Sequence, residues 1–259
     1  MSKRTALIVG INNYGSPDMN LGGCVNDATL LSRVIIANYG FDDVRTLLNS
    51  QATLLNISTT LKSMVEDLRP GDHLLFYFSG HGTQVPDKNS DESDGLDECI
   101  VTHDHDWDNP FTDDILRKCL KGHPQGANIT VVVDACHSGT ITDDSRGKTY
   151  KVPDGLLDGK ADAPVNLFGV KQSNPGTQRH VLLASSSEKD YSYEGVFGGR
   201  RQGLMTGIFL NLIRNKKFSS FNWYQLRRRI YNRVFRRSRR RQTPVVTGPM
   251  KLLNKKPFA

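Results

Sequence analysis

The chain has 259 residues, a mass of 28.9 kDa and 37% hydrophobic residues, which is enough for one large α/β domain. No apolar run approaches 18 residues, and the apolar stretch near the N-terminus is too short for a signal peptide, so we expect a cytoplasmic protein without a membrane partner. The four cysteines, Cys24, Cys99, Cys119 and Cys136, have no C-x-x-C spacing, which argues against a zinc ribbon or a disulfide framework and predicts reduced thiols.

The net charge of +7 is distributed unevenly along the chain. Residues 91–114 hold ten Asp and Glu and no Lys or Arg, whereas residues 216–241 hold eleven Lys and Arg and no acid. The acidic and the basic segment therefore each need an explanation of their own.

Apolar runs alternate with helix signals along the chain. Each strand-like run is continuously apolar rather than alternating, which is typical of a mostly parallel sheet covered on both faces. The expected strands are 5–11, 43–48, 73–82, a run that starts at residue 129, and 180–187; the expected helices are one from Asn26 and Asp27 to Gly40, then 53–71, 111–122 with Thr112 as its cap, 203–214 and 222–236.

We expect one domain in three parts. Residues 1–140 form its first part, and 179–259 form its last. Residues 141–178 between them are rich in Gly, Pro, Asp and Lys and have no convincing period, so they are predicted to be a flexible linker.

Two of the expected strands end in residues that can do chemistry. The stretch 78–82 reads FSGHG and 134–139 reads DACHSG, and ligands of parallel sheets bind at the carboxyl ends of the strands. If these strands are neighbours, Cys136 can act as a nucleophile with His81 as its base, and the amides of Gly82 and Cys136 can hold an oxyanion. A cysteine at the end of a buried strand is more often a packed hydrophobe, so the pairing with His81 carries this prediction. His137 is the rival base, but it follows Cys136 directly and should point away.

These motifs resemble those of the caspase-like cysteine peptidases, and of the metacaspases in particular. YFSGHGTQ followed by VVVDACHSG carries the resemblance, together with ALIVGINNY, LGGCVNDA and QTPVVTG. It implies a caspase-like (caspase-hemoglobinase) α/β fold with about six mostly parallel strands between helices, a large-then-small subunit order, a Cys-His dyad, cleavage of peptides or proteins after Arg or Lys, and a monomer.

The residues themselves also favour a basic substrate. Side chains two apart on a strand point the same way, so Asp134 shares a side with Cys136, and Ser79 shares one with His81. Asp27 can add a second carboxylate, and the alternative is that it is an ordinary helix cap. The resemblance places Cys24, Asp27, Ser79 and Asp134 in the primary specificity pocket.

The acidic segment suggests a cation site or a solvated loop. An EF-hand is rejected because Glu92 stands where that loop needs Gly, and His103 and His105 lack a third ligand for zinc. By resemblance, an activating calcium ion binds Asp97, Asp113, Asp114 and Asp143.

The linker and the basic segment leave further alternatives open. An enzyme that cuts after basic residues could cleave itself at one of the linker residues Arg146, Lys148, Lys151, Lys160 and Lys171. The basic helix has apolar residues at helical spacing, so a solvated helix packed on the sheet is expected rather than a nucleic-acid site. A catalytically silent interaction module and a nucleic-acid-binding scaffold are the alternatives to a peptidase.

Overall fold

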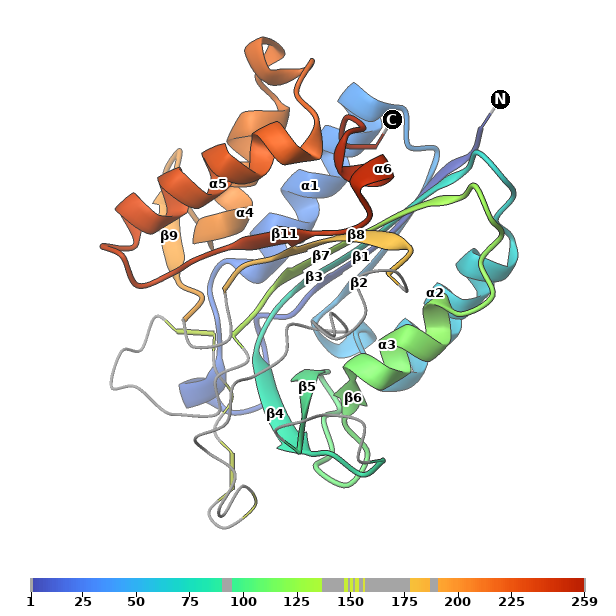
Figure 1. Cartoon of the computed structure of the whole chain (residues 1–259). Helices are drawn as coiled ribbons and strands as arrows, with labels where there is room; N and C mark the ends of the chain where they lie inside the picture. The colour runs from blue at the N-terminus through green and yellow to red at the C-terminus, as the bar shows by residue number, and fades with distance from the viewer. Residues whose placement is uncertain are drawn as a thin grey trace.

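A computed structural model gives the structure of the chain (Figure 1). It describes residues 2–89, 95–136, 147–148, 150, 152–153, 156, 178–186 and 191–258.

A six-stranded sheet forms the centre of the molecule, with the strand order β11-β8-β7-β3-β1-β2. Five strands run parallel, and β11 pairs antiparallel with β8 at one edge, which confirms the predicted mostly parallel sheet. The strands are β1 (Arg4–Gly10), β2 (Asp43–Leu48), β3 (His73–Ser79), β7 (Asn128–Asp134), β8 (His180–Ala184) and β11 (Val245–Thr247).

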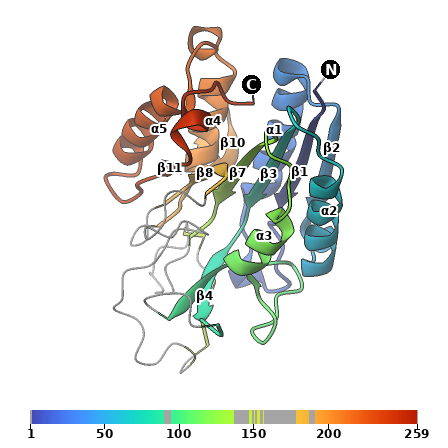
Figure 2. The same ribbon diagram turned by 45° about the vertical axis from the view of Figure 1, so that its right-hand side comes forward.

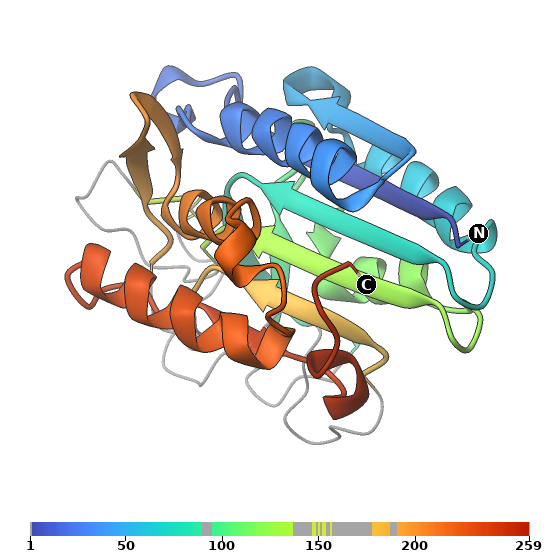
Figure 3. The same ribbon diagram turned by 90° about the horizontal axis from the view of Figure 1, so that it is seen from above.

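Helices cover both faces of this sheet, as Figures 2 and 3 show from two further directions. One face carries α1 (Cys24–Tyr39), α4 (Leu204–Ile213), α5 (Trp223–Arg237) and α6 (Met250–Leu253), and the other carries α2 (Leu54–Glu66) and α3 (Asp113–Leu120). The short 3-10 helices are η1 (Pro17–Met19), η2 (Asn49–Gln51) and η3 (Lys216–Phe218).

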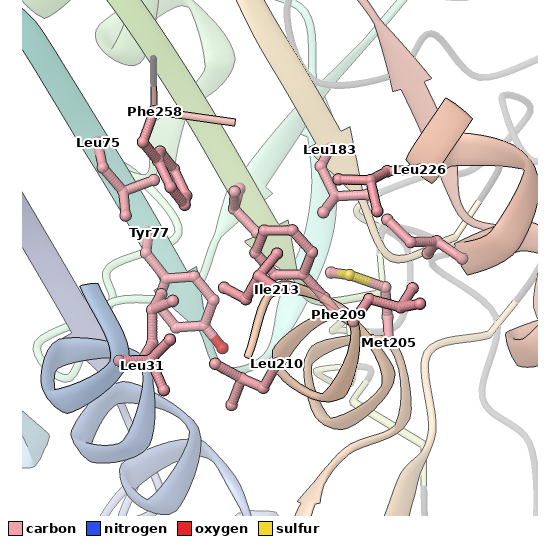
Figure 4. Close-up of a cluster of buried hydrophobic side chains, with 14 of the residues drawn as sticks. Leu31, Leu75, Tyr77, Leu183, Met205, Phe209, Leu210, Ile213, Leu226 and Phe258 are labelled. Atoms are coloured by element: carbon pink, nitrogen blue, oxygen red, sulfur yellow. The ribbon is translucent and has the colours of Figure 1, made fainter. Parts of the chain in front are cut away.

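The core consists of two apolar clusters, one on each face of the sheet. Successive side chains of a strand point to opposite faces, so Ala6 and Ile8 of β1 join the cluster under α1, α4 and α5, whereas Leu7 and Val9 join the one under α2 and α3. Figure 4 shows part of the first cluster, with Leu31, Tyr77, Phe209 and other residues in contact over the sheet. Because the central strands are buried on both faces, the middle of each strand is mostly apolar.

Helix ends differ from the prediction by a few residues. α1 starts at Cys24, three residues before Asp27, so Asp27 lies inside the first turn and is not the cap. α2 starts after Thr53, whose side chain accepts a hydrogen bond from the Asn56 N–H, and stops at Glu66, before Pro70.

The predicted strand 73–82 is two strands. β3 ends at Ser79, and β4 (Gly82–Pro86) pairs with β5 (Leu96–Ile100), which pairs with β6 (Phe111–Thr112). This three-stranded sheet projects from the carboxyl end of β3 (Figure 1). A hairpin of β9 (Glu194–Phe197) and β10 (Arg200–Gly203) was also not predicted, because short polar strands carry little periodicity.

The basic helix α5 buries the expected apolar face. Leu226, Ile230 and Val234 are buried in the cluster of Figure 4. Arg229 stacks on Phe218 and Phe221, and other arginines of α5 cover Phe197 and Tyr224, so many of these guanidinium groups shield aromatic rings. Within the described part of the chain, no helix combines the length and the apolar character that crossing a bilayer requires.

Candidate active site

The two motif-bearing strands are neighbours. β3 and β7 pair in parallel with Ser79 opposite Asp134, so His81 and Cys136, each two residues further on, leave the sheet at the same edge. The peptide units also touch there, since a Cβ added to Gly82 would lie 2.1 Å from the Cys136 carbonyl oxygen. Only glycine fits at that position.

The imidazole of His81 is buried and oriented by backbone groups. Its Nε2 lies 2.7 Å from the carbonyl oxygen of Met19 in η1, and the His81 N–H donates to the Tyr14 hydroxyl at 2.7 Å. A carbonyl can only accept, so the proton sits on Nε2 and leaves a lone pair on Nδ1. Nδ1 is buried and has no hydrogen-bond partner among the described residues. Burial lowers the pKa of His81 to about 4, although the backbone of Met19 and of Lys148 opposes this shift.

The thiol of Cys136 is fully buried at the start of the connection after β7. It donates to the Ser192 carbonyl oxygen at 3.4 Å and accepts from the Ser192 N–H. Ser192 comes from the last part of the chain, so the two predicted parts of the domain meet at the sulfur.

A polar pocket lies beside these two residues, and the side chain of Lys148 fills it. The Lys148 ammonium lies 3.0 Å from Asp134 Oδ1 and 3.8 Å from Asp27 Oδ2, and it donates to Ser79 Oγ at 2.9 Å. Ser79 in turn donates to Asp27 Oδ2 at 3.0 Å. Burial raises the pKa of the Cys24 thiol to about 12, and the nearby Lys148 charge only partly opposes this shift. The four predicted pocket residues therefore surround one lysine, whose side chain is 0% exposed.

The backbone of Lys148 is held as tightly as its side chain. The Gly82 N–H donates to the Lys148 carbonyl oxygen at 3.1 Å, and the Lys148 N–H donates to the Ser192 carbonyl oxygen at 3.0 Å. Gly147 forms an antiparallel bridge with Tyr193. The predicted oxyanion donor Gly82 thus binds the carbonyl group of the residue whose side chain occupies the pocket.

The two pocket carboxylates differ in acidity. Burial raises the pKa of Asp134, but the Lys148 charge and hydrogen bonds from Thr206 and Ser192 outweigh burial and hold it below its usual value. Burial also raises the pKa of Asp27, and there the Asp134 charge adds to the effect. Asp134 is consequently the principal counter-ion of the ammonium.

Other groups that build the pocket were not predicted. Gly203 forms a wall, because a Cβ added there would lie 2.2 Å from Asp134 Oδ2 and 2.7 Å from the Lys148 ammonium. Its N–H donates to Asp27 at 2.8 Å, and the Thr206 N–H donates to Asp134 at 3.0 Å. No local signal in the sequence identifies these donors, since they lie far from the motifs along the chain.

Three of the four residues predicted to bind calcium lie in the described part of the chain. Asp97 lies on β5, and Asp113 and Asp114 begin α3, where Arg117 pairs with both at 2.6 and 2.9 Å. Asp113 Oδ1 is buried without a hydrogen-bond partner in the described structure. No three acidic, His or Cys side chains of the described residues converge enough to hold a metal ion, and Asp143 lies outside those residues, as does His137.

Comparisons with known proteins show which family this chain resembles. Residues 4–145 match the model of the metacaspase, peptidase C14 domain. Metacaspase-7 of Arabidopsis thaliana is 38% identical over 154 residues, which is 56% of this chain and 37% of that protein, and Metacaspase-3 of the same plant is 30% identical over 227 residues, 82% of this chain and 60% of that protein. Metacaspase-1 of Candida glabrata is 37% identical over 150 residues, 54% of this chain and 38% of that protein, so the matched parts are well under half the length of some relatives.

A solved structure is similar over nearly the whole chain. The crystal structure of protein GSU0716 from Geobacter sulfurreducens superimposes with a TM-score of 0.71 and 27% sequence identity, and covers 99% of this chain and 98% of that one. The family model and the relatives together show that this chain belongs to the metacaspase family.

Proposed function

We propose that this chain is a cysteine endopeptidase that cuts after Arg or Lys, with Cys136 as the nucleophile and His81 as the base. The observation that carries the proposal is the position of Lys148, given by the contacts of its side chain and its carbonyl oxygen. Its ammonium is paired with Asp134, while its carbonyl oxygen accepts from the Gly82 N–H beside Cys136 and His81. A peptide with a basic residue before the scissile bond would need these same two contacts, one for its side chain and one for its carbonyl oxygen.

The chemistry follows from the positions of the groups. The lone pair on His81 Nδ1 takes the thiol proton, and the Cys136 sulfur attacks the carbonyl carbon. The oxygen becomes an oxyanion that the Gly82 N–H stabilises, and the Cys136 amide is the second predicted donor. His81 then gives its proton to the leaving amine, and water hydrolyses the thioester to restore the thiol.

The pocket selects a long cation by its charge and its length. Transfer of an unpaired ammonium into a dry pocket costs several kcal/mol or more, and a full set of oxygen partners offsets that cost. Here Asp134, Asp27 and Ser79 supply those oxygens at the far end of the pocket. An acidic side chain would meet two carboxylates, so cleavage after Asp should be excluded.

Peptides that differ only in the residue before the scissile bond test this function. We expect hydrolysis after Arg and Lys to exceed hydrolysis after Asp or norleucine by at least about a hundredfold in kcat/KM, and to vanish in Cys136→Ala. Equal hydrolysis after Arg and norleucine would contradict the specificity. No hydrolysis of any peptide, with or without calcium, would favour the catalytically silent module.

The same contacts support self-processing after Lys148. A cut there divides the 28.9 kDa chain into 148 and 111 residues, or about 16 and about 12 kDa by length. Lys148→Arg should retain this cut and Lys148→Met should lose it. Lys217→Met changes an exposed lysine and serves as the matched control. A cut that persists in Cys136→Ala would assign it to another protease.

Calcium stimulation is the last part of the proposal. Asp97, Asp113 and Asp114 supply the hard carboxylate oxygens that calcium prefers, and Asp113 Oδ1, which has no hydrogen-bond partner in the described structure, can serve as a ligand. Asp143, seven residues after Cys136, is the proposed fourth ligand. Bound calcium would order the chain beside the nucleophile. A calcium titration of peptide hydrolysis, compared between wild type and Asp113→Asn, tests this role.

A further inference from the structure

Tyr150 lies two residues after Lys148 and is also held in place. Its N–H donates to the Gly82 carbonyl oxygen at 3.1 Å, and its own carbonyl oxygen accepts from Thr83 Oγ1 at 3.4 Å. If the bond after Lys148 is the scissile bond, Tyr150 is the second residue beyond the cut. This position of Tyr150 relative to the cut rests on the proposed function.

The ring of Tyr150 is surrounded by other rings. The centroid distances are 5.5 Å to His105, 5.7 Å to His81, and 5.9 Å to both Tyr14 and Trp107. Aromatic pairs at such distances attract each other beyond the effect of buried area. Since His81 is also the proposed base, this cluster lies directly beside the reacting atoms.

The walls of the cluster are neutral. His105 packs edge-on against Trp107, with the centroids 4.7 Å apart, and both of its ring nitrogens are buried without a hydrogen-bond partner in the described structure. Burial lowers the pKa of His105 to about 4, so the imidazole is uncharged at neutral pH. Such walls favour an uncharged aromatic side chain over a charged one.

The wall that carries His105 and Trp107 is anchored by its own contacts. The His103 N–H donates to the Ala52 carbonyl oxygen at 3.0 Å, and the Asp104 carboxylate accepts from the Leu54 N–H at 2.8 Å. The Val101 N–H donates to the carbonyl oxygen of His81 at 3.0 Å. These bonds link the loop to α2 and to the end of β3, and none of them involves Tyr150. The subsite is therefore preorganised.

We propose that Tyr14, His105 and Trp107 form a subsite for an aromatic side chain at the second position after the scissile bond. Its ligand is a Tyr or Phe of a protein substrate, and Tyr150 is the example that this chain supplies itself. The subsite lies on the opposite side of the cut from the Asp134 pocket, so the enzyme reads a basic residue before the bond and an aromatic residue after it.

Internally quenched peptides test the subsite. Two peptides share Arg before the bond and differ in having Tyr or Ala at the second position after it. We expect wild type to hydrolyse the Tyr peptide roughly tenfold faster in kcat/KM, and Trp107→Ala to reduce this ratio below about threefold. A coumarin amide of the same Arg peptide has no residue beyond the bond to fill the subsite, so Trp107→Ala should slow the coumarin amide far less than it slows the Tyr peptide.

The outcomes separate the subsite from the proposed function. Equal rates for the Tyr and Ala peptides in wild type would overturn the subsite while the peptidase stands. If wild type hydrolysed neither the quenched peptides nor the coumarin amide, both the subsite and the proposed peptidase function would be contradicted. If Trp107→Ala slowed the coumarin amide as much as the Tyr peptide, Trp107 would support the fold rather than bind substrate, and the proposal would fall.

Self-processing offers an independent readout. Tyr150→Ala should slow the appearance of the fragments several-fold, whereas Tyr150→Phe should retain the rate. Tyr231→Ala is the matched control, since Tyr231 is an exposed tyrosine of α5 that is 40% accessible. Unchanged processing in Tyr150→Ala would overturn the assignment of its ring to the subsite.

Discussion

Two groups of carboxylates in this molecule pair with a basic side chain, but they differ in how far that side chain is buried. In the pocket, Asp134 and Asp27 hold Lys148, which comes from another part of the chain and is 0% exposed. At the start of α3, Asp113 and Asp114 hold Arg117 of the same helix, whose side chain is 41% exposed. The first group encloses its cation, and the second leaves its cation partly exposed to solvent. The two groups therefore differ not in charge but in the origin and burial of the cation, which is why we propose a specificity pocket for the first and an ion site for the second.

Removing the pocket charge should have the largest effect. Asp134→Asn keeps the volume but leaves the ammonium without its principal counter-ion, and loss of one partner of a buried pair costs about 3–5 kcal/mol. We expect kcat/KM for Arg and Lys peptides to fall roughly 10²- to 10³-fold. Asp113→Asn, assayed at saturating calcium, should cause a much smaller loss. Similar losses in the two variants would remove the distinction between the groups.

Closing the pocket should have the next largest effect. A Cβ in Gly203→Ala would lie 2.2 Å from Asp134 Oδ2, so the carboxylate or the bound cation must shift. We expect at least about a tenfold loss in kcat/KM for Arg peptides, and a smaller loss for the slimmer Lys side chain. Gly195→Ala is the control, because its added Cβ would make only ordinary contacts at 3.5 Å. A Gly203→Ala enzyme with wild-type kinetics would show that this wall does not limit the pocket.

Removing the arginine that pairs with Asp113 and Asp114 should strengthen calcium binding at the start of α3. Arg117→Gln removes the guanidinium that pairs with Asp113 and Asp114, so a calcium ion no longer competes with it. We expect the calcium concentration at half-maximal thermal stabilisation to fall several-fold. Lys118→Gln is the control, because Lys118 is 75% exposed and lies 4.0 Å from Asp114. Weaker calcium binding in Arg117→Gln would mean that the arginine supports the site.

The smallest effect concerns pH. Burial lowers the pKa of His81, His105 and His180 to about 4, whereas unfolded histidine titrates near 6.5. The unfolded chain therefore binds more protons between these values, so the stability present above about pH 6.5 is lost progressively down to about pH 4. Urea unfolding at several pH values measures this slope, and His105→Phe should flatten it. A midpoint independent of pH in that window would contradict the burial of these imidazoles in neutral form.

The sequence was most informative where residues act through local order. Continuous apolar runs predicted the parallel strands, and the two strand ends predicted that His81 and Cys136 would share an edge, which the register of Ser79 with Asp134 bears out. Asp27 was left open between a helix cap and a pocket residue. Because α1 starts at Cys24, Asp27 is not the helix cap. Its hydrogen bonds with Ser79 and Gly203 show that it lines the polar pocket instead.

The sequence was least informative where the site depends on distant backbone. Met19 orients His81 through a carbonyl group, and Ser192 contacts Cys136 through its own backbone, so neither side chain carries a signal. The sequence could name Lys148 only as one of five basic linker residues, because only the folded structure shows that the Lys148 side chain lies between Asp134 and Asp27. The strands β4, β5 and β6 have only two to five residues each and lie in or next to a strongly acidic segment, so no periodic pattern identified them.

Labelling of the proposed nucleophile tests the central claim most directly. An alkylating peptidyl-arginine probe is incubated with Lys148→Ala protein, whose pocket is free of the chain's own lysine, and the adduct is located by mass spectrometry of peptides. We predict a single adduct on Cys136 that is lost in His81→Ala and strongly reduced in Asp134→Asn. An adduct on another cysteine, or equal labelling by the matching peptidyl-aspartate probe, would contradict the account.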